Sequence, residues 1–172
     1  MKVQKMCIVA MLMAMAIAVA VLESFIPSFS IPGIKFGFAN IIILVTLYEF
    51  GLIDALIVNL GRVFVASLIR GTLFQMGFFM SLTGALLSMI VMWVLIKCFK
   101  KLTPIAVSVV GAVFHIAGQF LIAIPFLGTT NILYYAPILL LISVGTGILN
   151  GIVVILIKKT KVLENLKLKY NL

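Results

Sequence analysis

The chain has 172 residues, of which 65% are hydrophobic and only 10% are charged, and its mean hydropathy is +1.36. A soluble domain carries about 25% charged residues, so this composition excludes an ordinary soluble fold and predicts an integral membrane protein in contact with lipid. The net charge of +9 would suggest a nucleic-acid partner in a soluble protein, but here most lysines flank apolar segments and indicate membrane topology instead.

About six membrane-spanning helices are predicted, because a hydrocarbon core of about 30 Å takes about 20 helical residues to cross. The second segment is unusually short for a span. The first resembles a signal peptide, but its length and the apolar segments that follow favour an uncleaved helix. Loops are predicted at 27–37, from 70 onward and at 125–131, where proline and glycine gather. The predicted helices cover about residues 6–25, 38–48, 55–69, 77–96, 104–124 and 133–157.

Lysines are concentrated in three clusters, which begin at Lys2, Lys97 and Lys158. Alternate threading of six spans puts all three on one side, which the excess of positive charge marks as cytoplasmic. The prediction is therefore a single all-α transmembrane domain over 1–157, with both chain ends in the cytoplasm. Residues 158–172 are predicted to form a basic amphipathic tail that lies on the inner leaflet.

Arg62 is the most informative polar residue, because it falls near the middle of the third span, one helical turn after Asn59. A charged arginine at the bilayer centre costs about 3 kcal/mol on insertion scales, so it needs a partner. Glu23, near the outer end of the first span, is the acid that could reach it. Two interpretations are open: a buried Glu23–Arg62 pair or a snorkelling arginine, and a ligand that supplies negative charge or acceptors.

Several more polar residues fall in the outer half of the predicted bundle, and positive charge exceeds negative charge there. His115 and Gln119 are four residues apart and therefore share a helix face. Such a set is typical of a pocket for an anionic or strongly hydrogen-bonding small molecule. The candidate substrate-binding residues are Glu23, Lys35, Asn40, Asn59, Arg62, Arg70, His115, Gln119, Asn131 and Tyr135.

The residue patterns of metal centres and of catalysis are missing from the sequence. A single histidine and the lack of paired carboxylates do not suit a metal site, and no phosphate-binding loop for ATP occurs. Cys7 and Cys98 are interpreted as small apolar residues without a disulfide. We therefore expect a non-enzymatic protein without an intrinsic cofactor, in which any redox group would be a bound flavin or quinone.

Ala10, Ala14 and Ala18 recur every four residues along the first span and form a smooth ridge. Small residues let membrane helices approach closely. The ridge is interpreted either as ordinary packing inside this bundle or as a docking surface for a separate membrane protein.

Several segments together resemble a bacterial membrane family, the Gx transporter family, also labelled heptaprenyl diphosphate synthase component I. The Pro-Gly-Ile-Lys and Ala-Asn residues within 32–40 are the most specific of them. The matching segments are Glu23-Ser24-Phe25-Ile26-Pro27, Pro32-Gly33-Ile34-Lys35-Phe36-Gly37-Phe38-Ala39-Asn40, Gly61-Arg62-Val63, Ser81-Leu82-Thr83-Gly84, and Gly111-Ala112-Val113-Phe114-His115 with Gln119.

The resemblance implies a multi-pass protein of the bacterial cytoplasmic membrane, similar in architecture to the substrate-binding components of energy-coupling factor vitamin transporters. These capture a vitamin-like ligand from outside and dock through an alanine ridge on a transmembrane coupling protein with ATPases. It also implies two alternatives: a partner of an extracytoplasmic flavin-binding protein in electron transfer, and a non-catalytic component linked to polyprenyl diphosphate synthesis. Prenyl chain extension uses Asp-rich motifs, whereas this sequence has one aspartate, Asp54. A structural assembly factor without a ligand is a further possibility.

Overall fold

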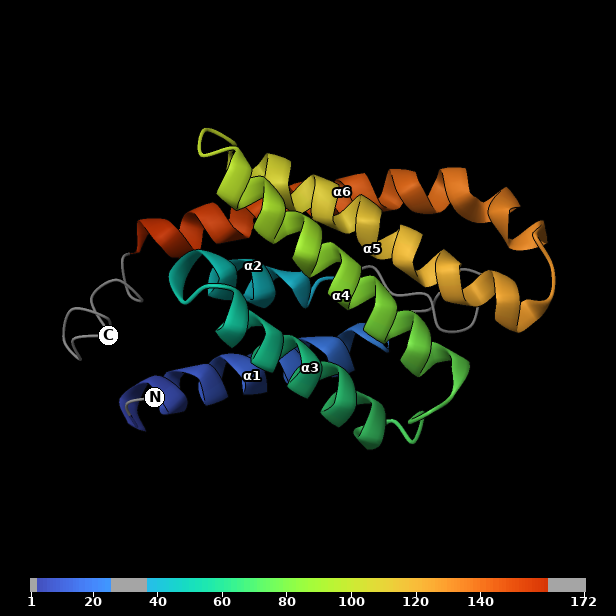
Figure 1. Ribbon diagram of the computed structural model, residues 1–172, viewed down its shortest axis with the longest axis horizontal. Helices are drawn as coiled ribbons and strands as arrows, with labels where there is room; N and C mark the ends of the chain where they lie inside the picture. Colours follow the sequence, from blue (N-terminus) through green and yellow to red (C-terminus); the bar gives the residue numbers. More distant parts are fainter. Residues whose placement is uncertain (1–2, 26–36, 161–172) are drawn as a thin grey trace.

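The computed structural model describes residues 3–25 and 37–160, and within them every regular element is helical, as predicted (Figure 1). Apolar composition and breaks at Gly51, Gly71 and Gly128, which all have positive φ, delimit the helices. The elements are α1 (Val3–Glu23), α2 (Asn40–Glu49), α3 (Leu52–Ile69), α4 (Met76–Cys98), α5 (Pro104–Leu127), the 3-10 helix η1 (Asn131–Tyr135) and α6 (Ala136–Lys159).

Five helical segments of the described chain are long and apolar enough to cross a membrane; α2 is the short exception. The predicted loop start at Pro125 is corrected by the structure. Helix α5 continues through Pro125 to Leu127, because Gly128 closes the helix in the left-handed conformation. α6 ends at Lys159, and most of the tail predicted over 158–172 lies outside the described residues, so the tail stays a prediction.

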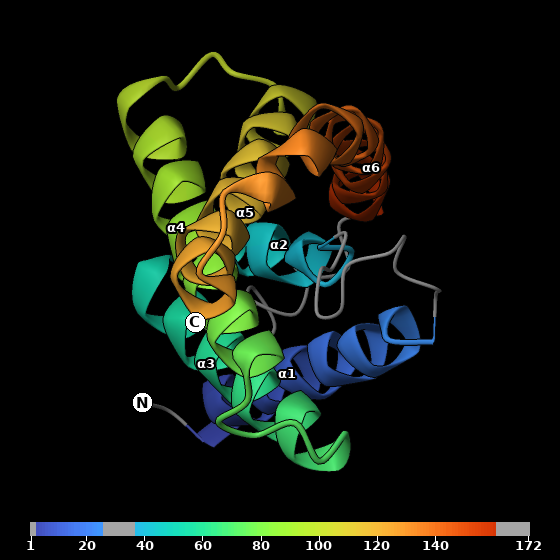
Figure 2. The same ribbon diagram turned by 90° about the vertical axis from the view of Figure 1, so that its right-hand side faces the viewer.

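The short helix α2 lies in the middle of the bundle, between α1 and α3 on one side and α5 and α6 on the other (Figure 2). It packs against each of the other α-helices. Its ten residues extend about 15 Å, which is about half of the hydrocarbon core. Gly37, just before it, lies beside His115 in the middle of α5. The amino end of α2 therefore lies at mid-depth in the bundle.

One end of the bundle, which we call the lysine end, carries Lys5, Lys97 and Lys158. Lys5 Nζ lies 2.7 Å from Asp54 Oδ2, which joins the start of α1 to the start of α3. Lys158 Nζ lies 4.1 Å from the ring centroid of Tyr48. Figure 1 shows α1 beginning and α6 ending at this same end. The start of α1 and the end of α6 thus lie at one end of the bundle, while the assignment of that end to the cytoplasm stays a prediction.

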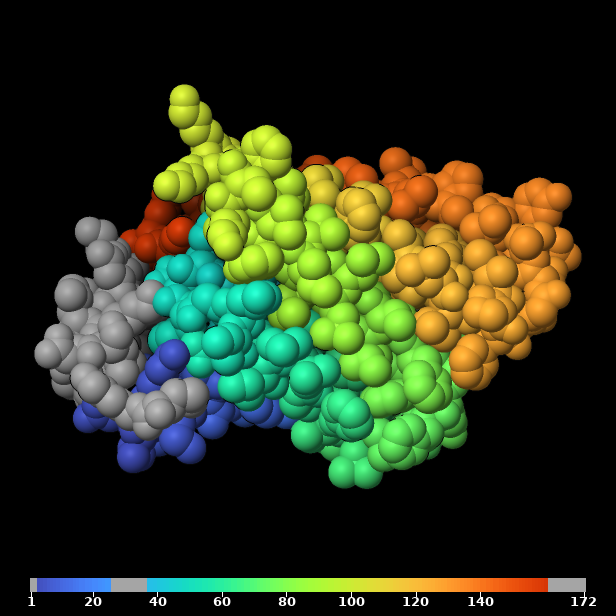
Figure 3. Space-filling view, in the orientation of Figure 1, coloured from blue at the N-terminus to red at the C-terminus, as the bar shows by residue number. Residues whose placement is uncertain are grey.

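The outside of the bundle is apolar and its interior holds polar side chains. Figure 3 shows a face formed largely by α3, α4 and α5. Large exposed residues on the helices include Ile53, Leu68, Leu121 and Leu141, with exposed fractions from 65 to 74%. A soluble protein would bury such residues, so this surface suits lipid.

The helices α4, α5 and α6 are held together by close backbone contacts at glycines. A Cβ atom on Gly118 of α5 would lie 2.7 Å from the Cα atom of Gly84 on α4. A Cβ atom on Gly147 of α6 would likewise lie 2.7 Å from the Cα atom of Val109 on α5. Glycine thus permits helix contacts that any side chain would block.

The alanine ridge of α1 is not used for packing inside the bundle. Ala10, Ala14 and Ala18 are all exposed, whereas Ala16 and Ala20 are buried. The structure thus contradicts the interpretation of the ridge as internal packing. Docking on a partner stays a prediction.

Candidate functional site

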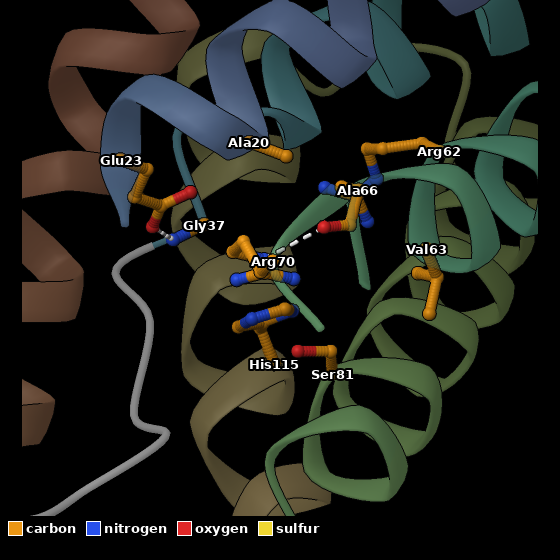
Figure 4. A pocket seen from close by; sticks show the side chains of 9 residues that line it. All are labelled: Ala20, Glu23, Gly37, Arg62, Val63, Ala66, Arg70, Ser81 and His115. Atoms are coloured by element: carbon orange, nitrogen blue, oxygen red, sulfur yellow. Dashed lines mark hydrogen bonds between the residues drawn. The ribbon is translucent and has the colours of Figure 1, made fainter. Parts of the chain in front are cut away.

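A small cavity lies in the half of the bundle away from the lysine end (Figure 4). It offers about 20 Å³ to the centre of a water molecule, which is room for about one water. Side chains from α1, α3, α4 and α5 meet there with Gly37, which lies three residues before α2. Within the described chain, the lining residues are Ala20, Glu23, Gly37, Arg62, Val63, Ala66, Arg70, Ser81 and His115.

Arg62 reaches the cavity from the middle of α3 and is only 5% exposed. Its Nη2 donates a hydrogen bond of 2.7 Å to Asn59 Oδ1, and Asn59 Nδ2 donates one of 3.0 Å to the Ala85 carbonyl on α4. Asn59 therefore fixes Arg62 and ties α3 to α4. Within the described chain, Arg62 Nε is buried without a hydrogen-bond partner, so the guanidinium keeps a donor for a ligand or water.

Arg70 lies at the carboxyl end of α3, where a cation is favoured by the helix dipole. Its Nε donates a hydrogen bond of 2.9 Å to the Ala66 carbonyl, drawn in Figure 4. Partial burial lowers the pKa of the Arg70 guanidinium, and the Glu23 carboxylate partly offsets this.

Glu23 connects the end of α1 to the start of α2. Its Oε1 accepts a hydrogen bond of 2.5 Å from the Gly37 backbone N–H, and the carboxylate is buried. Gly37 has a φ of +83°, which favours glycine, and its carbonyl accepts a hydrogen bond of 3.2 Å from Asn150 Nδ2 on α6. These contacts hold the amino end of α2, the positive end of its dipole, beside the cavity.

His115 on α5 is 3% exposed and lies under Arg70 in the view of Figure 4. A Cβ atom on Gly37 would lie 3.4 Å from His115 Cδ2, so glycine at 37 allows α2 to begin this close to the ring. A Cβ atom on Gly84 would lie 2.8 Å from the His115 carbonyl, so glycine at 84 lets α4 approach the same turn of α5. Ser81 completes this side of the cavity and donates its hydroxyl to the Gly77 carbonyl at 2.8 Å.

The structure brings together four of the predicted site residues: Glu23, Arg62, Arg70 and His115. Three others, Asn40, Asn59 and Gln119, are buried nearby without lining the cavity, and Asn40 Nδ2 donates to Ser88 Oγ at 3.3 Å. Asn131 and Tyr135 are exposed on η1 and also lie outside the lining, while Lys35 lies outside the described residues. Binding by any of these residues stays a prediction.

Two polar members of the cavity are missing from the predicted set: the Gly37 N–H and Ser81. Asn150, which holds Gly37, is missing too. Ser81 and Asn150 are polar groups inside apolar segments, which is the signal that identified Arg62 and would have indicated them. A backbone N–H such as that of Gly37 is present at nearly every residue, so no residue type in the sequence marks the one that lines the cavity.

The fold and the cavity define a multi-pass, all-α membrane protein with a buried polar site that holds the only two arginines of the sequence. The chain belongs to the heptaprenyl diphosphate synthase component I family, whose model matches residues 12–157. This confirms the family that the sequence resembles. No curated protein and no solved structure compared with the chain matches it.

Proposed function

We propose that this protein is a membrane subunit that captures a small anionic molecule, of the vitamin, cofactor or isoprenoid-precursor kind, from outside the cell. The observation that carries the proposal is the convergence of both arginines and of Gly37, three residues before α2 begins, on one cavity in the half away from the lysine end. Half-helices whose amino ends point at a site near the membrane midplane are used by transporters to hold anionic groups.

The ligand enters by opening the bundle, because the cavity as it stands admits only about one water. A ligand that binds the open conformation better than the closed one shifts the population toward it. The apolar walls, from Ala20, Val63 and Ala66, suit a molecule that also has an apolar part.

The energy for uptake would come from a partner, because the sequence lacks a phosphate-binding loop for ATP. The exposed Ala10, Ala14 and Ala18 on α1 support docking on an energy-coupling transmembrane protein with ATPases. With the protein in the bacterial cytoplasmic membrane, the lysine end would face the cytoplasm, where the ATPases of such a partner lie.

A second candidate follows from the family description: a non-catalytic membrane component linked to polyprenyl diphosphate synthesis. A diphosphate is an anion that two guanidinium groups can hold, so the same cavity would serve as its binding site. This candidate predicts that a prenyl-synthesising protein co-purifies with the chain. The capture hypothesis predicts a retained small molecule and a coupling partner.

The test begins with mass spectrometry of the small molecules and proteins that co-purify with the chain in mild detergent. Any retained molecule is then titrated back while the midpoint of thermal unfolding is followed, since a ligand of the folded state raises it. Arg62→Ala and Arg70→Ala should each weaken binding about 10- to 100-fold, the effect of one charged hydrogen bond.

Lys100→Ala is the matched control, because it removes a cation from the loop beyond α4 at the lysine end. It should bind as the unmodified chain does. Wild-type affinity in both arginine variants would exclude the cavity as the binding site. A flavin-like absorbance band in the purified protein would favour electron transfer with an extracytoplasmic flavin-binding protein over transport.

A further inference from the structure

The Gly37 N–H lines the cavity three residues before α2 begins, and it is already engaged. An N–H group donates one hydrogen bond, and Glu23 Oε1 accepts it at 2.5 Å. Glu23 is 6% exposed, so this contact is shielded from solvent. A ligand anion that accepts from the Gly37 N–H therefore has to replace the Glu23 carboxylate.

The charges of the described residues that line the cavity do not balance. Among them, Arg62 and Arg70 contribute two positive charges and Glu23 one negative charge, which leaves an excess of one positive charge. Arg62 is only 5% exposed, and its Nε has no hydrogen-bond partner within the described residues. The site thus has both a charge and a donor available for one anionic group.

The carboxylate of Glu23 and a ligand anion do not fit side by side. In the closed bundle the cavity admits about one water, so an oxyanion group is enclosed there only when the Glu23 carboxylate moves away. Two negative charges in contact also repel strongly where water is excluded. The anion and Glu23 therefore compete for the same place.

We propose that Glu23 is a built-in competitor at this site: its carboxylate occupies the Gly37 N–H until a ligand with a single oxyanion group, carboxylate or phosphate, displaces it. The inference rests on the anion site proposed above and adds the class of its ligand and the contact that the ligand breaks. Displacement releases the end of α1 from the start of α2.

Inorganic phosphate is the probe, added at constant ionic strength while the thermal midpoint of the detergent-solubilised full chain is measured. Glu23→Gln keeps an oxygen that can accept from Gly37 but removes the charge. It should bind phosphate at least about tenfold more tightly than the unmodified chain, because the competitor and its repulsion are removed. Glu49→Gln, at the other end of α2, removes a charge of the same kind and should leave phosphate affinity unchanged.

Equal or weaker phosphate binding by Glu23→Gln, together with loss of binding in Arg62→Ala, would overturn the displacement and leave the anion site standing. If phosphate stabilises neither the unmodified chain nor Glu23→Gln, the anion site itself is wrong and the displacement falls with it.

A second measurement uses the unmodified chain and does not depend on the folding of a variant. In protein labelled with ¹⁵N-glycine, the Gly37 amide resonance should move when phosphate is added, because its acceptor changes. A Gly37 resonance that stays in place at phosphate concentrations that raise the thermal midpoint would also overturn the proposal.

Discussion

Asn59 is the neighbour that holds the Arg62 guanidinium by a hydrogen bond within the described residues. Asn59 accepts from this guanidinium at 2.7 Å and is itself anchored on the Ala85 carbonyl at 3.0 Å. In a membrane-spanning segment the N–H groups of Arg62 and Asn59 cannot hydrogen-bond to bulk water. The hydrogen bond to Asn59 therefore fixes the orientation of the Arg62 guanidinium.

Asn59→Ala should lower the free energy of unfolding by about 2 kcal/mol, because it leaves a buried charged donor without its acceptor. Denaturant titration of the detergent-solubilised protein measures this. Asn131→Ala is the control: Asn131 is exposed on η1, so its replacement should change stability by less than about 0.5 kcal/mol. Similar losses in both variants would contradict the role given to Asn59.

At the residue scale, the sequence predicts those cavity residues whose side chains are ionisable and therefore costly to place inside a membrane. Arg62, Glu23 and His115 stand out because ionisable groups are rare at membrane depth. Asn131 and Tyr135 are also polar, but they are exposed on η1 and do not line the cavity, because packing decides which residues of a helix face the interior. Ordinary backbone groups such as the Gly37 N–H carry no signal of this kind.

At the scale of the helices, close contact between α4 and α5 depends on glycine residues. Gly118→Ala would place a Cβ atom 2.7 Å from Gly84 Cα and 2.9 Å from the Thr83 carbonyl oxygen. Both are backbone atoms, so no side-chain rotation can relieve the overlap. We expect a loss of about 1 to 3 kcal/mol from this overpacking, and a weaker site, because His115 lies on the same contact.

Gly145→Ala on α6 is the matched control for this variant. A Cβ atom there meets nothing within 4 Å, and alanine favours helix over glycine by about 1 kcal/mol. Thermal unfolding should therefore show Gly145→Ala unchanged or stabilised and Gly118→Ala destabilised. The opposite order would mean that the helices α4 and α5 do not pack through these glycines.

The two faces of α1 allow docking to be separated from folding. Ala14→Leu adds volume to the exposed ridge, so thermal stability of the isolated protein should hardly change while co-purification of a membrane partner is lost. Ala16→Leu adds the same volume at a position with 0% exposure and should cost about 1 to 3 kcal/mol. A partner that remains bound to Ala14→Leu would show that the ridge faces only lipid.

The helices themselves were largely predictable, because apolar length and the breaks at proline and glycine are local signals. The boundaries were less so. The third span was expected from residue 55 but α3 begins at Leu52, since Gly51 lets the chain turn and Asp54 fits into the first helical turn. Pro125 was interpreted as a helix end, although it lies within the last turn of α5.

At the scale of the whole molecule, charge and polarity divide the bundle into two ends. The lysine end holds Lys5, Lys97 and Lys158, and the other half holds the cavity. This division predicts the orientation in the membrane. The positive-inside tendency puts the lysine end in the cytoplasm.

Cysteine labelling of intact cells checks this orientation. In a Cys7→Ala background, the native Cys98 is exposed at the lysine end and should react only with a membrane-permeant maleimide. Tyr134→Cys, at a position that is 85% exposed on η1, combined with Cys98→Ala, should react with an impermeant reagent. The reverse pattern would invert the topology and with it the direction of capture.

The half-length of α2 has a consequence for how the protein is made. A segment of ten residues cannot span a bilayer by itself, so it cannot enter the membrane as an independent unit during synthesis. The carbonyl of Gly37 is held by Asn150, which is translated 113 residues later. Backbone groups at membrane depth need such partners. The amino end of α2 therefore reaches its final place only after the last helix has been inserted, and until then the proposed binding site is incomplete.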